Sequence, residues 1–112
     1  MEQGGFDLQE LRLLYQGDRE SLREILELFK QDALPRCRTL ETTIASGDSS
    51  SAIKAAHSLA NLLGAIRNTG GAEAARRCEK ALRAADFGEA KRWRERVDRA
   101  VQESLDAIEA FG

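Results

Sequence analysis

The stretch AAHSLANLLG, residues 55–64, places the chain's single histidine, His57, inside a run of alanines and leucines. Residues of an α-helix advance by about 100° each, so the helical positions of these side chains can be compared directly. The large apolar side chains come out within about 60° of the direction opposite His57: they are Leu59, Leu62, Leu63 and Ile66. The stretch therefore predicts one amphipathic helix with a core on one side and His57 facing outward.

The rest of the chain has the same helical character. Ala, Leu, Glu and Arg are abundant, the chain has one proline, and no β-branched run alternates with polar residues. Turn signals at QGD, SGDSS, NTGG and DFG divide the chain into a short helix over about 7–15 and longer helices over about 19–46, 50–68, 71–85 and 89–110. Long amphipathic helices joined by short turns pack as antiparallel neighbours. We expect a single all-α domain over residues 1–112, an antiparallel up-and-down four-helix bundle preceded by the short helix.

Composition and charge exclude several classes of function. A net charge of −2 argues against a nucleic-acid binder that neutralises many phosphates. No apolar stretch approaches the roughly 20 residues of a membrane span, and the N-terminus lacks the pattern of a secretory signal, so we expect a cytoplasmic protein. Cys37 and Cys78 are far apart and one histidine is present. A zinc site needs clustered ligands, so we expect two reduced, partly buried thiols and no metal site.

The predicted outer face around His57 has an unusual composition. Within about 60° of His57 lie Ile53, Lys54, Ala60, Asn61 and Gly64. A glycine inside a helix costs about 1 kcal/mol relative to alanine, and on an outer face it favours close approach of another surface to the backbone. The face is therefore typical of a docking surface, although a lone exposed histidine can also have no task.

The chain resembles a histidine-containing phosphotransfer (HPt) domain of multistep two-component phosphorelays. The family motif His-x-Leu-Lys-Gly is matched by His57-Ser58-Leu59-Ala60-Asn61. The flanking segments LREILELFKQDALPRCRTLE, SGDSSSAIKAAHSL and RRCEKALRAAD resemble the helices around that motif. The resemblance implies that His57 is the phosphoacceptor, and that the partners are receiver domains of response regulators or of hybrid sensor histidine kinases. It also implies a monomeric phosphocarrier with no cofactor of its own, whose partner supplies Mg²⁺. The domain would be free-standing or the cytoplasmic part of a membrane-bound sensor kinase.

Two positions depart from that family pattern. Ala60 stands where the family has a lysine and Asn61 where it has a glycine. Lys54, one turn before His57, and Arg67 are the candidates to offset phosphoryl charge instead, and Asn61 can donate an amide hydrogen bond. The later position of the loop glycine suggests that the histidine helix is about one turn longer. The loss of the lysine leaves a second hypothesis open: a helical module that docks a receiver or a kinase without phosphoryl transfer.

Overall fold

The computed structural model describes residues 8–111, which form five α-helices and contain no strand. The predicted all-α fold class is therefore confirmed. The helices are α1 (Gln9–Leu14), α2 (Arg19–Ser46), α3 (Ser49–Ala65), α4 (Thr69–Arg83) and α5 (Phe87–Phe111). α2 continues through Pro35 as one helix. The predicted start of the first helix at residue 7 lies outside the described residues.

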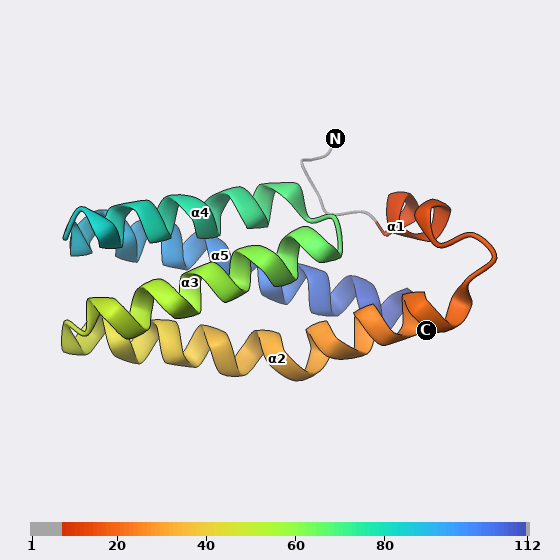
Figure 1. Ribbon diagram of the computed structural model, residues 1–112, viewed down its shortest axis with the longest axis horizontal. Helices are drawn as coiled ribbons and strands as arrows, with labels where there is room; N and C mark the ends of the chain where they lie inside the picture. The colour runs from red at the N-terminus through yellow and green to blue at the C-terminus, as the bar shows by residue number, and fades with distance from the viewer. Residues whose placement is uncertain (1–7, 112) are drawn as a thin grey trace.

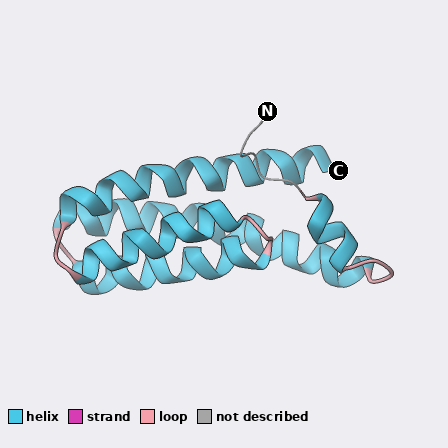
Figure 2. Cartoon of the chain, turned by 90° about the horizontal axis from the view of Figure 1, so that it is seen from above, coloured by secondary structure: helices cyan, strands magenta, loops and turns pink. Residues whose placement is uncertain are grey.

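The four long helices lie side by side, and the colour gradient in Figure 1 runs in alternating directions along consecutive ones. α2 and α4 each pack against both α3 and α5. α1 lies at the end of the molecule where α2 begins (Figure 1). Figure 2 shows the turns as short segments at the helix ends, which leaves the helix flanks as the main surfaces of the molecule.

Each turn between long helices combines a left-handed residue with an Asx cap. Gly47, Arg67 and Ala85 have positive φ angles of 77°, 67° and 58°. After α3, for example, the Arg67 N–H donates to the Gly64 carbonyl and the Asn68 N–H to the Leu63 carbonyl, which is a Schellman motif. The next residue of each turn then accepts a backbone N–H of the following helix through its side-chain oxygen: these caps are Asp48, Asn68 and Asp86.

This turn geometry moves two helix boundaries away from their predicted positions. The structure ends α3 at Ala65, three residues before its predicted end at about residue 68. The NTGG sequence is not a loop, because Asn68 caps α4 and the three residues after it form the first helical turn. Sequence patterns give helix boundaries only approximately, since glycine at the start of a helix looks like a turn residue.

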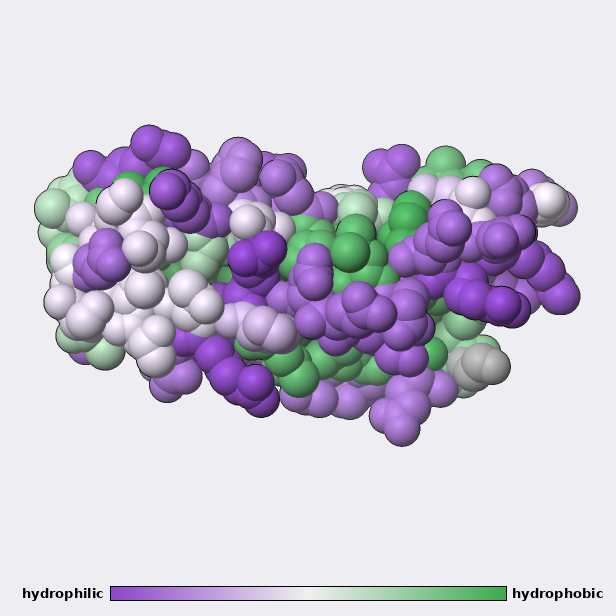
Figure 3. All heavy atoms as spheres, turned by 60° about the horizontal axis from the view of Figure 1, so that its bottom comes forward, coloured by the Kyte–Doolittle hydropathy of each residue, from purple (hydrophilic) through white to green (hydrophobic). Residues whose placement is uncertain are grey.

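The core between α3, α4 and α5 is built largely from small side chains, which allow close helix approach. Eight alanines of α3 and α4 are buried. The closest approach is at Gly71, where a Cβ would lie 2.7 Å from the Cβ of Ala100. Beside it, the buried Asn68 Nδ2 donates to Ser104 Oγ at 2.8 Å. Figure 3 shows that some hydrophobic surface stays uncovered near the middle of one face, between hydrophilic side chains.

Both cysteines are free and buried. Burial raises the pKa of the Cys37 thiol to about 12, and the nearby Asp98 carboxylate adds to this shift. Burial likewise raises the pKa of Cys78 to about 11, and its Sγ lies 3.4 Å from the Ala90 carbonyl oxygen. Because only a thiolate is a strong nucleophile or metal ligand, both residues act as small apolar core residues.

Candidate functional site

His57 lies on the outer side of α3, as the helical angle predicts. Its side chain is 63% exposed, whereas Leu59 and Leu63 of the same helix are completely buried. The buried leucines fix the rotation of α3 about its axis, because turning the helix would bring them into water. The imidazole is therefore presented to solvent from a rigid, packed helix.

The imidazole of His57 contacts a carboxylate from the neighbouring helix. Nδ1 lies 3.4 Å from Oε1 of Glu79 on α4. Glu79 is only 15% exposed, so the carboxylate lies beneath the more exposed ring. Helical periodicity around His57 does not predict Glu79, because 22 residues separate the two. In the sequence, Glu79 is found only within RRCEKALRAAD, one of the segments that resemble the family.

Arg83, one turn further along α4, holds Glu79 in place. Its Nη2 and Nε donate to Oε2 of Glu79 at 2.8 and 3.2 Å, which leaves Oε1 for His57. Burial raises the pKa of Glu79, but the hydrogen bonds from Arg83 and His57 outweigh burial and the net pKa is lowered. The carboxylate is therefore an anion near neutral pH. It stabilises a proton on Nδ1, and the lone pair of Nε2 is then free to act as a nucleophile.

The other residues predicted around His57 are divided between exposed and buried positions. Lys54 and Asn61 are exposed, and Ile53 and Gly64 are half-buried. The prediction that Ala60 lies on the exposed face is wrong: only 4% of it is exposed. Ala56 is buried on the same side of α3. The buried face of the helix is therefore wider than the positions of its leucines indicate.

Gly64 and Arg67 also differ from expectation. Gly64 is the second-last residue of α3, and a Cβ there would meet no heavy atom within 4 Å. No contact among residues 8–111 therefore requires a glycine at this position, and the close approach of a partner surface stays a prediction. Arg67 is not on the helix at all, but in the left-handed position of the α3–α4 turn. The helical periodicity of α3 therefore does not determine where the Arg67 side chain lies relative to His57.

Ala60, Asn61, Gly64 and Arg67 line one groove of about 670 Å³, which we name the α3 groove. The groove is not lined by Ile53, Lys54 or His57. The predicted docking face therefore consists of two regions: the α3 groove and the adjoining part of α3 that carries these three residues. The remaining walls come from α1 and the turn after it, from α2, and from α4. The sequence analysis missed these residues, which are Leu11, Leu14, Tyr15, Ile25, Ala65 and Arg76.

Comparison with known families adds an independent observation. The family model described as the Hpt domain matches residues 24–111, which is more than half of the chain. The chain belongs to the Hpt domain family. No curated protein and no solved structure matches it closely enough to count as similar. The recognised resemblance is thereby confirmed at the level of the family.

Membership of the Hpt domain family connects the chain with phosphorelay signalling, in which such domains are phosphocarriers and not enzymes. The matched range includes α3 and α4, and hence both His57 and Glu79, but begins after α1. Within residues 8–111, no helix is both long and apolar enough to cross a bilayer. The same residues contain no cluster of three or more side chains suited to hold a metal ion.

Proposed function

We propose that this Hpt domain is a phosphorelay intermediate that carries a phosphoryl group on Nε2 of His57. The observation that carries the proposal is the contact between His57 Nδ1 and Glu79 on a side chain that is 63% exposed, which leaves Nε2 as the ring nitrogen available to a partner. The donor would be the aspartyl phosphate of a receiver domain linked to a kinase, and the acceptor an aspartate of a response regulator. A cytoplasmic location and a monomeric state remain predictions that accompany this function.

In the proposed reaction, the Nε2 lone pair attacks phosphorus in line with the leaving aspartate oxygen. The N–P bond forms as the P–O bond breaks, and the aspartate leaves as a carboxylate. The imidazole keeps its Nδ1 proton and becomes positively charged. Glu79, held by Arg83, stabilises this charge electrostatically. The return reaction is the same exchange in reverse, with the second aspartate as nucleophile. The Mg²⁺ that such a transfer needs would belong to the receiver.

The arrangement of cations supports two separate roles near His57. Lys54 is exposed on α3, one turn before His57, where its ammonium group can offset phosphoryl charge. Arg67 and Arg76 line the α3 groove together with apolar side chains of α1 and α2. We propose that this groove docks the receiver, with apolar contacts supplying affinity and the two arginines facing the acidic region around its aspartate.

We further propose that the four long helices form the antiparallel up-and-down bundle predicted from the sequence. What supports this is that α2 and α4 each contact α3 and α5, as opposite members of a bundle do. A rigid bundle suits a phosphocarrier, because it holds the nucleophile in position while the partner supplies the rest of the active site.

Ala60 favours one alternative function, a module that docks a receiver without phosphoryl transfer. The family lysine is absent there, and the buried Ala60 side chain could not be replaced by lysine without burying its aliphatic stem. In this alternative the α3 groove still binds a receiver, but His57 takes up no phosphate. The two functions therefore differ in chemistry and share a surface.

A transfer experiment separates the two. Receiver domains are phosphorylated with acetyl phosphate and Mg²⁺, freed of donor, and mixed with the wild-type domain or with His57→Gln. We expect wild type, and not the variant, to gain acid-labile, alkali-stable phosphate. If no receiver transfers phosphate, the relay function is wrong. Binding of a receiver, seen as amide shifts around the α3 groove without transfer, would then support the docking module.

A further inference from the structure

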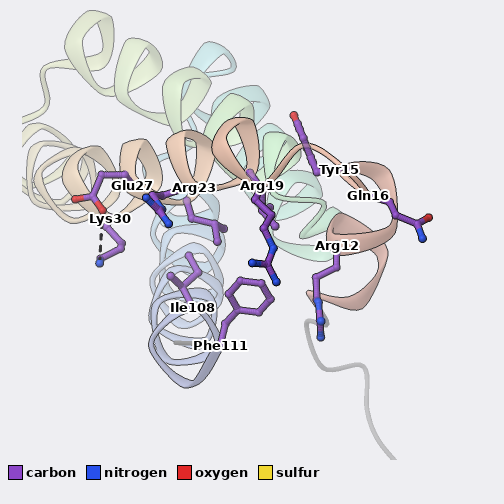
Figure 4. Close-up of a pocket in the computed structure, with 12 residues that line it drawn as sticks. Arg12, Tyr15, Gln16, Arg19, Arg23, Glu27, Lys30, Ile108 and Phe111 are labelled. Atoms are coloured by element: carbon purple, nitrogen blue, oxygen red, sulfur yellow. Dashed lines mark ion pairs between the residues drawn. The ribbon is translucent and has the colours of Figure 1, made fainter.

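A second groove lies next to the α3 groove, and Tyr15 lines both. It has a volume of about 650 Å³ and is formed by α1 and its following turn, the first half of α2, and the end of α5. Figure 4 shows its side chains, with Arg19 extending from α2 toward the Phe111 ring of α5 and Arg12 extending from α1. We name it the basic groove. Its volume is within the range of small-molecule sites.

The charged side chains that line the basic groove are mostly cations. Four basic side chains line it, Arg12, Arg19, Arg23 and Lys30, against a single carboxylate. That carboxylate, Glu27, already pairs with Lys30 at 3.7 Å. The chain as a whole has a net charge of −2, so this concentration of positive charge is local.

Among the described residues, two of these cations have no side-chain partner. The side chains of Arg19 and Arg23 make no ion pair or hydrogen bond with any of residues 8–111. They are four residues apart on α2 and so lie on the same face of the helix. Arg12 is placed differently, with its guanidinium 5.4 Å from the centre of the Phe111 ring. An anion entering the groove would therefore meet two guanidinium groups that need not first break another contact.

The remaining lining of the basic groove is apolar. Leu22 and Leu26 of α2 and Ile108 of α5 are each less than 10% exposed and belong to the core. Phe111 is 40% exposed and closes one side. The Phe111 ring is therefore the main apolar surface of the groove still open to water; a ligand with an apolar chain would cover it, whereas an inorganic anion would use only the arginines.

Part of the basic groove lies outside the family match. The match begins at residue 24, and Arg12, Arg19, Leu22 and Arg23 all precede it. His57 and Glu79 do not line the basic groove. Its function is therefore separable from phosphoryl transfer.

We propose that the basic groove binds an amphipathic anion, a carboxylate attached to a flexible apolar chain, as in a fatty acid. The carboxylate pairs with Arg19 and Arg23, and the chain lies against the exposed ring of Phe111, with Leu22, Leu26 and Ile108 forming the floor beneath it. This site goes beyond the proposed relay function. The bound ligand would contact α1, the first half of α2 and the end of α5.

Decanoate is the probe that tests the proposal. Amide shifts of the ¹⁵N-labelled domain are followed during titration with decanoate, below its micelle concentration. We expect saturable shifts confined to residues 12–30 and 108–111. Decyltrimethylammonium, with the same chain and the opposite charge, should give no saturable shifts there, and inorganic phosphate should bind much more weakly than decanoate.

Paired variants decide which side chains bind the probe. Arg19→Gln combined with Arg23→Gln should weaken decanoate binding about fivefold or more, the effect of losing roughly 1 kcal/mol of partly exposed ionic contact. The matched control is Arg36→Gln with Arg38→Gln, which removes the same charge from exposed positions of the same helix outside the groove. The proposal fails if decyltrimethylammonium shifts the same residues, if phosphate binds as tightly, if no saturable shift occurs, or if both double variants behave alike.

Discussion

Nδ1 of His57 lies 3.4 Å from Oε1 of Glu79, so the exposed imidazole is held by a carboxylate that is itself mostly buried. A surface histidine without such a contact can rotate about both side-chain torsions. Here the contact engages Nδ1 and restricts that rotation, which leaves Nε2 as the nitrogen available to a partner. The nucleophile of the proposed relay is therefore prepared before any partner arrives.

The first prediction concerns this contact directly. Glu79→Ala should lower the rate of phosphoryl transfer to His57 about tenfold, which is about 1.4 kcal/mol of transition-state stabilisation. The ¹⁵N shifts of the imidazole should at the same time show a smaller fraction of the Nδ1–H tautomer. Glu73→Ala is the control, because that exposed carboxylate is on the same helix and contacts Arg76 and Arg77 instead. Unchanged transfer and tautomer fractions would contradict the assigned role of Glu79.

A second prediction follows from the lowered pKa of Glu79. Burial alone raises that pKa, but the hydrogen bonds from Arg83 and His57 lower it further than burial raises it. A carboxyl group whose pKa is lower in the folded state stabilises the fold above its unfolded pKa and loses this contribution as pH falls. Glu79→Gln should therefore reduce the acid dependence of the free energy of unfolding between about pH 5 and 3. Urea unfolding at several pH values measures this free energy. If it falls equally with pH in the variant and in wild type, the prediction is contradicted.

The close packing of α4 against α5 gives a third prediction. A Cβ at Gly71 would lie 2.7 Å from Ala100 Cβ and 3.1 Å from Leu63 Cδ2. Gly71→Ala should destabilise the protein by about 1–3 kcal/mol through overpacking. Gly70→Ala is a neighbouring control with no heavy atom within 4 Å of its Cβ, and it should be neutral or stabilising by up to about 1 kcal/mol. Equal stabilities in urea unfolding would show that the helices do not approach this closely.

The sequence correctly predicted the side-chain directions that depend on helical periodicity. It did not predict the burial and the contacts that depend on packing between helices. The outward direction of His57 follows from the leucines of its own helix, and the structure agrees. The exposure of Ala60 depends on how closely α1 and α2 approach α3, which no pattern within residues 55–64 contains. Glu79 reaches His57 only through the packing of α4 on α3. Arg67 adopts a left-handed backbone that arginine rarely takes, so neither its position nor the end of α3 was predicted correctly.

Asn68 combines a cap with a buried hydrogen bond, and this gives a fourth prediction. Its Oδ1 accepts the Gly71 N–H at 2.9 Å while its Nδ2 donates to the buried Ser104 hydroxyl at 2.8 Å. Asn68→Ala should cost about 2–3 kcal/mol, because it removes the cap of the buried Gly71 N–H and the buried hydrogen bond that Ser104 Oγ accepts. Asp48→Ala removes only an exposed cap at the start of α3 and should cost about 1 kcal/mol. Urea unfolding compares the two, and equal losses would mean that the Ser104 contact adds nothing.

The last prediction separates the two roles proposed for the cations near His57. Lys54 is one turn from His57 on α3, so Lys54→Ala should shorten the lifetime of isolated phosphohistidine about two- to fivefold, as expected for a partly screened charge. Arg67 and Arg76 line the α3 groove and lie on other elements. Arg67→Ala and Arg76→Ala should instead weaken receiver binding, with an effect that declines as salt is added.

Two measurements check this division: the decay of phosphorylated domain after removal of the donor, and receiver titration at two ionic strengths. Lys91→Ala, at an exposed position of α5, is the control for loss of one positive charge. If Lys54→Ala changes receiver affinity but not phosphohistidine lifetime, the cation that offsets phosphoryl charge is not Lys54. If Arg76→Ala leaves affinity unchanged at both ionic strengths, the α3 groove does not carry the electrostatic part of docking.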